Sequence, residues 1–214
     1  MDVLTTQTLS GVQTSIEIAG TVAFALSGVM EAARKKLDAV GVCAVASVAA
    51  FGGGTLRDVL LDRRPLFWIE QSWYLWSVLI LCLTAMTLMR AKHFKPTEKS
   101  MQWPDALGLG LFAASGTQIA LGMQMPALIS VLMGVITATF GGVLRDIVCN
   151  EIPVSFKDHR PYALCSVAGG VIYIVLAAVD AEPWFCMTVC ALITVVFRVL
   201  AIWNDWTLPA WRND

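Results

Sequence analysis

Long apolar segments separated by short polar ones fill nearly the whole chain. Seven of them approach the roughly 20 residues that a helix needs to cross about 30 Å of hydrocarbon. They cover residues 14–33, 39–61, 70–90, 104–122, 126–148, 160–179 and 184–204. The pattern therefore predicts an all-α membrane protein with seven transmembrane helices in one domain, residues 1–204, and a short tail over residues 205–214.

A duplicated segment organises this pattern. The sequence AFGGGTLRD at residues 50–58 returns as ATFGGVLRD at residues 138–146, an offset of 88. The same offset pairs Phe24 with Phe112 and Pro65 with Pro153. Three helices fit in each copy, residues 14–90 and 104–179, and an odd number of spans inverts the second copy in the membrane. The helix at 184–204 is an addition to this inverted repeat.

Composition and charge agree with a membrane protein. Hydrophobic residues make up 57% of the chain and charged residues 14%, against roughly 25% charged in soluble domains. In the predicted topology, three of the 15 Lys and Arg residues lie on the side of the N-terminus and twelve on the other. Because basic residues favour the cytoplasmic side, we expect a multi-pass plasma (inner) membrane protein with its N-terminus outside and its C-terminus cytoplasmic.

Glycine runs lie in the middle of the second and fifth predicted helices. Glycine there costs about 1 kcal/mol per residue relative to alanine, so the runs are expected to kink both helices and free backbone groups toward a path. The alternative is that glycines only allow close helix packing. Nearby hydroxyls are candidate pore-lining groups. The predicted pore and hinge residues are Gly52, Gly53, Gly54, Thr55, Thr139, Phe140, Gly141 and Gly142, with hydroxyls from Ser27, Ser115 and Thr137.

Charged residues follow each glycine run. Adjacent helical residues point in different directions, so Arg57 need not pair with Asp58, nor Arg145 with Asp146, and partners are expected on another helix. These residues are interpreted as charged neighbours of a pore, or as a structural ion pair near the interface.

A second pair of acids is related by the repeat. Glu17 and Asp105 are expected at the starts of helices, where the helix dipole favours acids. The alternative is a cation-attracting mouth.

No pattern in the chain indicates catalysis or a bound metal. The six cysteines lie in apolar segments without a CxxC pair, and His93 and His159 lack further ligands nearby. The glycine run has no GKS, GKT or GxGxxG context, and no GxSxG or HExxH motif is present. We therefore expect no enzyme activity, cofactor, metal or nucleic-acid partner.

The doubled GG-x-L-R-D signature, with a proline after each copy, resembles the trimeric intracellular cation (TRIC) channel family, specifically its short prokaryotic members. The same family is also labelled a glycine-transporter-like domain. The resemblance implies a homotrimer with one hourglass pore per protomer, lined by kinked helices two and five, for monovalent cations, chiefly potassium and also sodium. Membrane lipids at protomer interfaces are further candidate partners. Phe140 departs from the pattern, because a third glycine would align there.

Two functions fit these sequence features. A cation channel would use freed carbonyls and hydroxyls to replace the water around an ion. A secondary transporter of a small solute such as glycine would need amide donors for a carboxylate and acids or carbonyls for an ammonium, which half-helix ends also supply.

Overall fold

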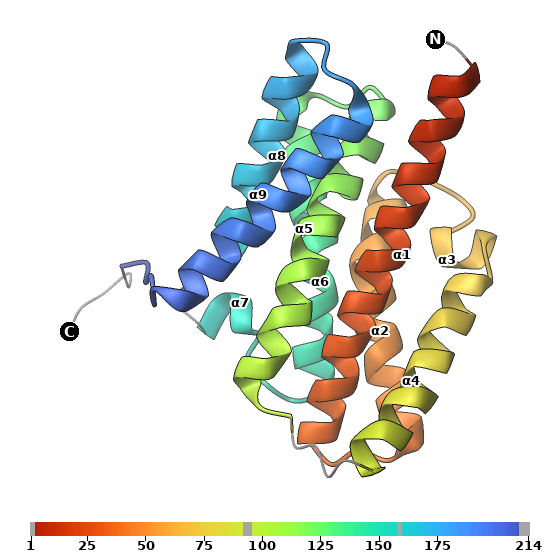
Figure 1. Ribbon diagram of the computed structural model, residues 1–214, viewed down its shortest axis with the longest axis vertical. Helices are drawn as coiled ribbons and strands as arrows, with labels where there is room; N and C mark the ends of the chain where they lie inside the picture. The colour runs from red at the N-terminus through yellow and green to blue at the C-terminus, as the bar shows by residue number, and fades with distance from the viewer. Residues whose placement is uncertain (1–2, 92–95, 158–159, 210–214) are drawn as a thin grey trace.

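The computed structural model describes residues 3–91, 96–157 and 160–209, and all regular structure within them is helical (Figure 1). His93, His159 and Trp211 lie outside the described residues. Within these described residues, seven long helices and two single-turn helices follow one another. Their bounds are α1 Val3–Arg34, α2 Ala39–Leu60, α3 Phe67–Glu70, α4 Trp73–Ala91, α5 Glu98–Gly122, α6 Ala127–Val148, α7 Val154–Lys157, α8 Ala163–Ala178 and α9 Pro183–Trp203.

The predicted helices are all present, but two of them begin earlier than expected. Helix α1 begins at Val3 rather than at residue 14, and α5 at Glu98 rather than at residue 104. Thr97 starts α5 with a capping box, in which its side chain accepts from the Ser100 backbone and the Ser100 hydroxyl accepts from the Thr97 backbone. Pro104 therefore lies inside the helix, whereas the predicted helix began at this residue.

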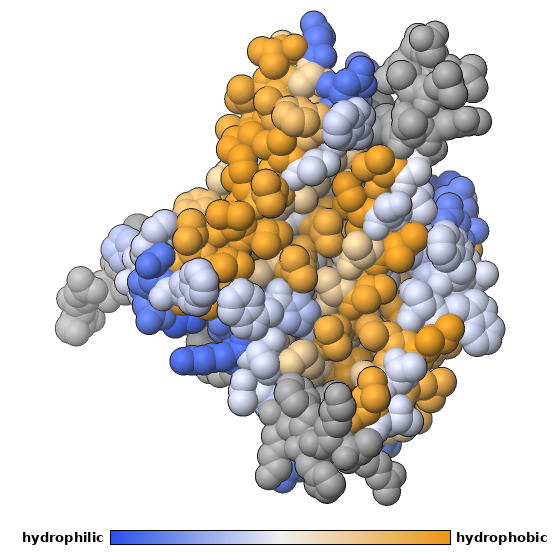
Figure 2. All heavy atoms as spheres, in the orientation of Figure 1, coloured by the Kyte–Doolittle hydropathy of each residue, from blue (hydrophilic) through white to orange (hydrophobic). Residues whose placement is uncertain are grey.

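The helices suit a bilayer to different degrees. In the part of the chain that the structure describes, four are long and apolar enough to cross one, within Gly11–Arg34, Ala39–Leu60, Ala127–Val148 and Pro183–Trp203, and α4 and α8 contain shorter apolar stretches. Large apolar side chains cover the outer surface of α8 and α9 (Figure 2), where Val175, Leu192 and Val196 are exposed. Such a surface fits lipid rather than water. The chain is a multi-pass membrane protein; the count of seven spans stays a prediction.

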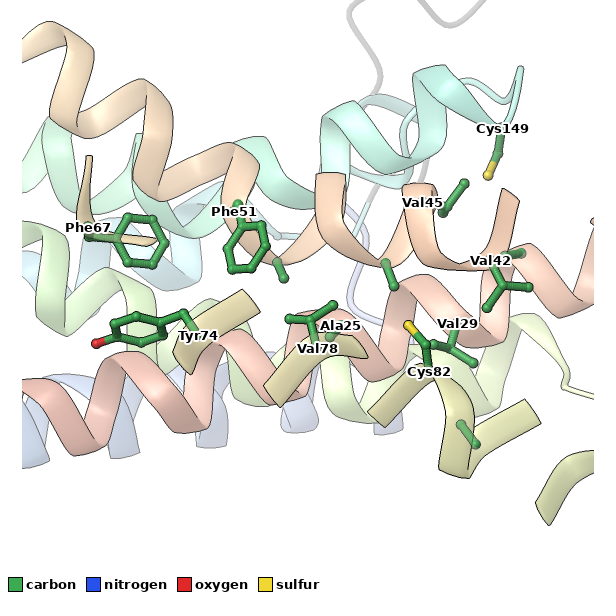
Figure 3. Packing of buried hydrophobic residues seen from close by; sticks show 14 residues of the cluster. Ala25, Val29, Val42, Val45, Phe51, Phe67, Tyr74, Val78, Cys82 and Cys149 are labelled. Atoms are coloured by element: carbon green, nitrogen blue, oxygen red, sulfur yellow. The ribbon is translucent and has the colours of Figure 1, made fainter. Parts of the chain in front are cut away.

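Helices α1, α2, α5 and α6 form the centre of the protein (Figure 1). Within each copy, α1 packs on α2 and α5 on α6. Between the copies, α1 packs on α5 and α2 on α6. Helix α4 covers α1 and α2, while α8 and α9 cover the second copy. In the first copy, Tyr74, Val78 and Cys82 of α4 point into an apolar cluster that includes Val29 and Val45 (Figure 3).

The glycine runs do not break their helices. Helix α2 continues through Gly52–Gly54 and α6 through Gly141 and Gly142, so the expectation of freed backbone groups is wrong. The glycines instead let α2 and α6 touch backbone to backbone. A Cβ at Gly53 would lie 2.0 Å from the Thr137 carbonyl oxygen, and one at Gly141 would lie 2.3 Å from that of Ala49. Close packing, the alternative interpretation, accounts for these two glycines.

Candidate functional site

Arg57 lies in the core with its guanidinium surrounded by partners from three helices. It is 1% exposed, and its Nε donates to the Asp58 Oδ1 at 2.8 Å. Its Nη1 donates to Glu17 Oε1 on α1 at 3.1 Å and to the Ser115 hydroxyl on α5 at 3.5 Å. The Ser115 hydroxyl itself donates to Glu17 Oε1 at 3.0 Å. Helices α1, α2 and α5 thus meet at one buried charged group.

Arg145 repeats this arrangement at the other end of the helix bundle. It is 2% exposed, and its Nε donates to Asp146 Oδ1 at 2.8 Å. Its Nη1 donates to Asp105 Oδ1 on α5 at 2.7 Å, and it also bonds the Ser27 hydroxyl on α1. We call these two groups the Arg57 network and the Arg145 network.

The two networks are related by the 88-residue offset, and they exchange their serines. Each arginine binds the acids of its own copy, but the serine of the other copy: Ser115 serves Arg57 and Ser27 serves Arg145. Since Ser115 also reaches Glu17 while Ser27 lies by Asp105, α1 and α5 run antiparallel. The networks therefore hold the two copies together by charge-assisted hydrogen bonds.

The remaining carboxylate oxygens explain the two single-turn helices. Asp58 Oδ2 accepts from the backbone N–H of Phe67 at 3.0 Å, where α3 begins. Asp146 Oδ2 accepts from the backbone N–H of Val154 at 2.9 Å, where α7 begins. Each aspartate thus fixes the chain that follows its own helix.

Tyrosines complete both networks. The Tyr162 hydroxyl donates to Asp105 Oδ2 at 2.7 Å, and the equivalent Tyr74 hydroxyl donates to Glu17 Oε2 at 3.4 Å. A hydrogen bond to a charged group stabilises by about 1.5–3 kcal/mol, and the shorter bond is the stronger of the two.

We expect Tyr162→Phe to lower the thermal stability of the purified protein more than Tyr74→Phe does. Equal melting temperatures for the two variants would contradict the difference in geometry.

A second arginine approaches each network, from a different place in each copy. Arg63, after α2, lies 3.9 Å from Asp58. In the second copy Arg198 on α9 stands over the Tyr162 ring, 4.9 Å from its centroid, and donates to the Pro161 carbonyl at 3.2 Å. Arg198 also lines a cavity of about 10 Å³ beside Arg145. Sequence reasoning counted it only as a basic residue near the cytoplasm, although an arginine inside an apolar helix is itself a signal.

An ion-pair cluster that the sequence did not indicate joins the end of α1 to the segment after α6. Glu31 is buried and pairs with Arg34 at 2.7 Å, while Glu151 contacts Arg34 at 3.5 Å and also Lys35. The offset places Ile119 at the position equivalent to Glu31, so the second copy has no acidic counterpart of this residue.

The predicted partners of the arginines are confirmed, and two other expectations need correction. Arg57 and Arg145 do bind acids on other helices, and they bind the adjacent aspartates as well, because a long arginine side chain can fold back along its helix. Glu17 and Asp105 do not start helices. They lie well inside α1 and α5 and are each 6% exposed. They are therefore neither in the first turn of a helix, where the helix dipole would favour them, nor at an open mouth that attracts cations.

Among the other candidate pore residues, Gly142 lies beside the Arg145 network, whereas most of the rest are engaged elsewhere. The hydroxyls of Thr137 and Thr139 donate to carbonyls of their own helix, those of Met133 and Val135. Thr55 accepts from the Trp68 indole at 3.0 Å. An apolar groove of about 590 Å³ runs along α2, α3 and α6, and Gly52, Thr55 and Phe140 line it. Gly54 packs on the Phe67 ring and Gly142 beside the Tyr162 hydroxyl.

Comparison with known proteins shows the family to which the chain belongs. A family model described as "Glycine transporter" matches residues 14–90 and again residues 102–178, segments that begin 88 residues apart. A solved structure of the TRIC trimeric intracellular cation channel orthologue from Rhodobacter sphaeroides matches with a TM-score of 0.83 and 31% identity, over 90% of this chain and 98% of that one. The chain belongs to the TRIC family.

Other known proteins are similar to this chain over at least four fifths of their own length. A prokaryotic TRIC channel solved in 0.5 M KCl has a TM-score of 0.85 and 26% identity, covering 93% of this chain and all of that one. The UPF0126 membrane protein of Vibrio cholerae is 38% identical over 91% of this chain and 80% of its own. The UPF0126 inner membrane protein YadS of Escherichia coli K12 is 32% identical over 93% and 96%.

Proposed function

We propose that this protein is a channel for monovalent cations, potassium above all, with one pore in each protomer of a homotrimer. The single observation that carries the proposal is the pair of buried arginine networks at the meeting point of the two copies. Solved relatives described as TRIC cation channels support it. Charged side chains inside transmembrane segments are costly and mark ion pathways, and this apolar chain buries two such groups.

The proposed path follows the side chains of the networks rather than the glycines. Arg57 and Arg145 occupy equivalent positions near the ends of α2 and α6, and the residues between Glu17 and Ser27 on α1 span about 15 Å at a rise of about 1.5 Å per residue. The two networks thus stand on opposite sides of the membrane midplane. Carboxylates and serine hydroxyls are oxygen ligands suited to hydrated monovalent cations, and the adjacent arginines balance the acids when no ion is present.

The proposed topology puts the Arg57 network toward the outside and the Arg145 network toward the cytoplasm. It keeps the two three-helix units, residues 14–90 and 104–179, inverted relative to each other, with the seventh long helix and the tail after them. The positive-inside bias supports this orientation, and the relative named as an inner membrane protein supports the location.

A transporter of glycine or another small solute is the second candidate, favoured by the description of the family model. A transporter of this architecture holds the carboxylate of its substrate with the amides of broken helices. Helices α2 and α6 are continuous through their glycines, so those amides are bonded within the helix. The uninterrupted helices favour the channel.

Recordings from purified protein in planar bilayers test the proposal. Unitary current steps whose reversal potential follows a potassium gradient are the expected result. Saturable glycine uptake into proteoliposomes, with no unitary current, would establish the transporter instead. Native mass measurement in mild detergent checks the assembly, for which three copies are expected, and a monomer or dimer would contradict it.

A further inference from the structure

Two phenylalanines that the duplication pairs, Phe24 and Phe112, stack on each other at the crossing of α1 and α5. Their ring centroids are 5.5 Å apart with the planes at 20°, and the side chains are 0% and 1% exposed. Each ring lies against a glycine of the opposite helix. A Cβ at Gly108 would lie 2.6 Å from the Phe24 ring, and one at Gly20 would lie 3.0 Å from that of Phe112. The glycines thus make the room that the two rings fill.

The stacked pair stands between the two arginine networks. On α1, Phe24 lies between Glu17 of one network and Ser27 of the other, and positions three or four apart share a helix face. On α5, Phe112 lies between Asp105 and Ser115 in the same way. Because α1 and α5 run antiparallel, the two rings meet at the middle of the row, each about 10 Å along its helix from the acid of its copy.

One polar group lies inside this apolar middle. Thr21 is fully buried, and its hydroxyl has no hydrogen-bond partner among the described residues. It occupies the turn between Glu17 and Phe24. Buried hydroxyls are normally paired, and Thr117 and Thr194 bond to carbonyls of their own helices. The equivalent position in the second copy is Leu109. The polar row therefore extends farther toward the rings from the Arg57 network than from the Arg145 network.

We infer that Phe24 and Phe112 form the apolar gate of the ion path, and that the Thr21 hydroxyl is a hydrophilic group beside this gate, on the side of the Arg57 network. The inference rests on the proposed channel function. Hydrophobic constrictions close a pore by excluding water, and two stacked rings packed on glycines leave no room for a hydrated ion. Either ring alone leaves half of the constriction, so both have to move or be removed for full opening.

Single-channel recording in symmetric KCl tests the gate with two double variants and one single variant. Phe24→Ala with Phe112→Ala is expected to raise open probability by about tenfold or more, because a hydratable gap replaces the dry segment. Phe24→Leu with Phe112→Leu keeps the segment apolar and is expected to stay mostly closed. Phe51→Ala is the matched control, since Phe51 is a buried ring stacked on Trp68 and lies on α2 away from the row.

The outcomes separate the gate from the channel itself. Absence of unitary current in the unaltered protein contradicts the proposed function. Current in the unaltered protein with the same open probability in the double alanine variant overturns the gate alone. If the double alanine variant does not assemble, the single variants Phe24→Ala and Phe112→Ala decide: a partial and similar rise in both supports the gate, and no rise in either overturns it.

Thr21 gives an additional readout that leaves the rings in place. Thr21→Val removes a hydroxyl with no partner among the described residues, so the folded protein is expected to keep its melting temperature. Unitary conductance is expected to fall, because the path beside the rings loses the Thr21 hydroxyl. An unchanged conductance in protein of normal melting temperature removes Thr21 from the path and overturns that part of the inference.

Discussion

Replacing Gly53 by alanine is expected to abolish the folded protein or to lower its free energy of unfolding by about 3 kcal/mol or more. The added Cβ would lie 2.0 Å from the Thr137 carbonyl oxygen. That oxygen belongs to the backbone of α6, which has to move as a whole to make room. The expected result is a large drop in melting temperature, which tryptophan fluorescence of the protein in detergent measures. Gly141→Ala should act alike, because its Cβ would meet the Ala49 carbonyl.

Gly122→Ala is the matched control for these glycines. Gly122 is exposed at the end of α5 with nothing within 4 Å of an added Cβ. The substitution favours the helix and is expected to leave the melting temperature unchanged or slightly raised. Normal stability of Gly53→Ala would mean that α2 and α6 do not touch there, and that the glycines act by bending or opening the helices after all.

Arg145→Met is expected to destabilise the protein by about 3–5 kcal/mol, because removing one partner of a buried ion pair leaves uncompensated charge. Asp105 and Asp146 would remain in the core with no cation between them. Adding Asp105→Asn to this variant removes one of the two orphaned charges and is expected to restore part of the loss. Thermal unfolding of the two variants measures the difference.

Arg64→Met serves as the control for charge removal, since Arg64 is exposed outside the helices, and little change is expected. A melting temperature for Arg145→Met equal to that of the control would show that the guanidinium is not buried as described. Greater instability of the double variant than of the single one would show that Asp105 is held by groups other than Arg145.

Sequence reasoning succeeded where a pattern is local and long. Apolar length predicted the helices, and the repeat predicted equivalent roles for Arg57 and Arg145. It failed where tertiary contacts decide. The four-residue helices α3 and α7 depend on N–H groups that donate to aspartates eight or nine residues earlier, across a turn that no helical pattern predicts. No local signal placed Glu17 in the core either, because the arginine that holds it is on another helix.

The glycine runs show the same limit in energetic terms. A local cost of about 1 kcal/mol per glycine predicts a break, but that cost is outweighed when two helices pack over their length. Gly53 and Gly141 each allow a contact that no other residue permits. The spacing of glycines within one helix does not reveal which helix they face, so the sequence left both interpretations open.

The exchange of serines between the networks bears on how such a chain could arise. A protein with only one copy would hold an arginine and its acids, but the hydroxyl that completes the set comes from a helix running the other way. Two such chains could satisfy each other only by entering the membrane in opposite orientations. Joining them in one polypeptide removes the need for an ancestor inserted both ways, and it commits each half to accept only substitutions that the other tolerates.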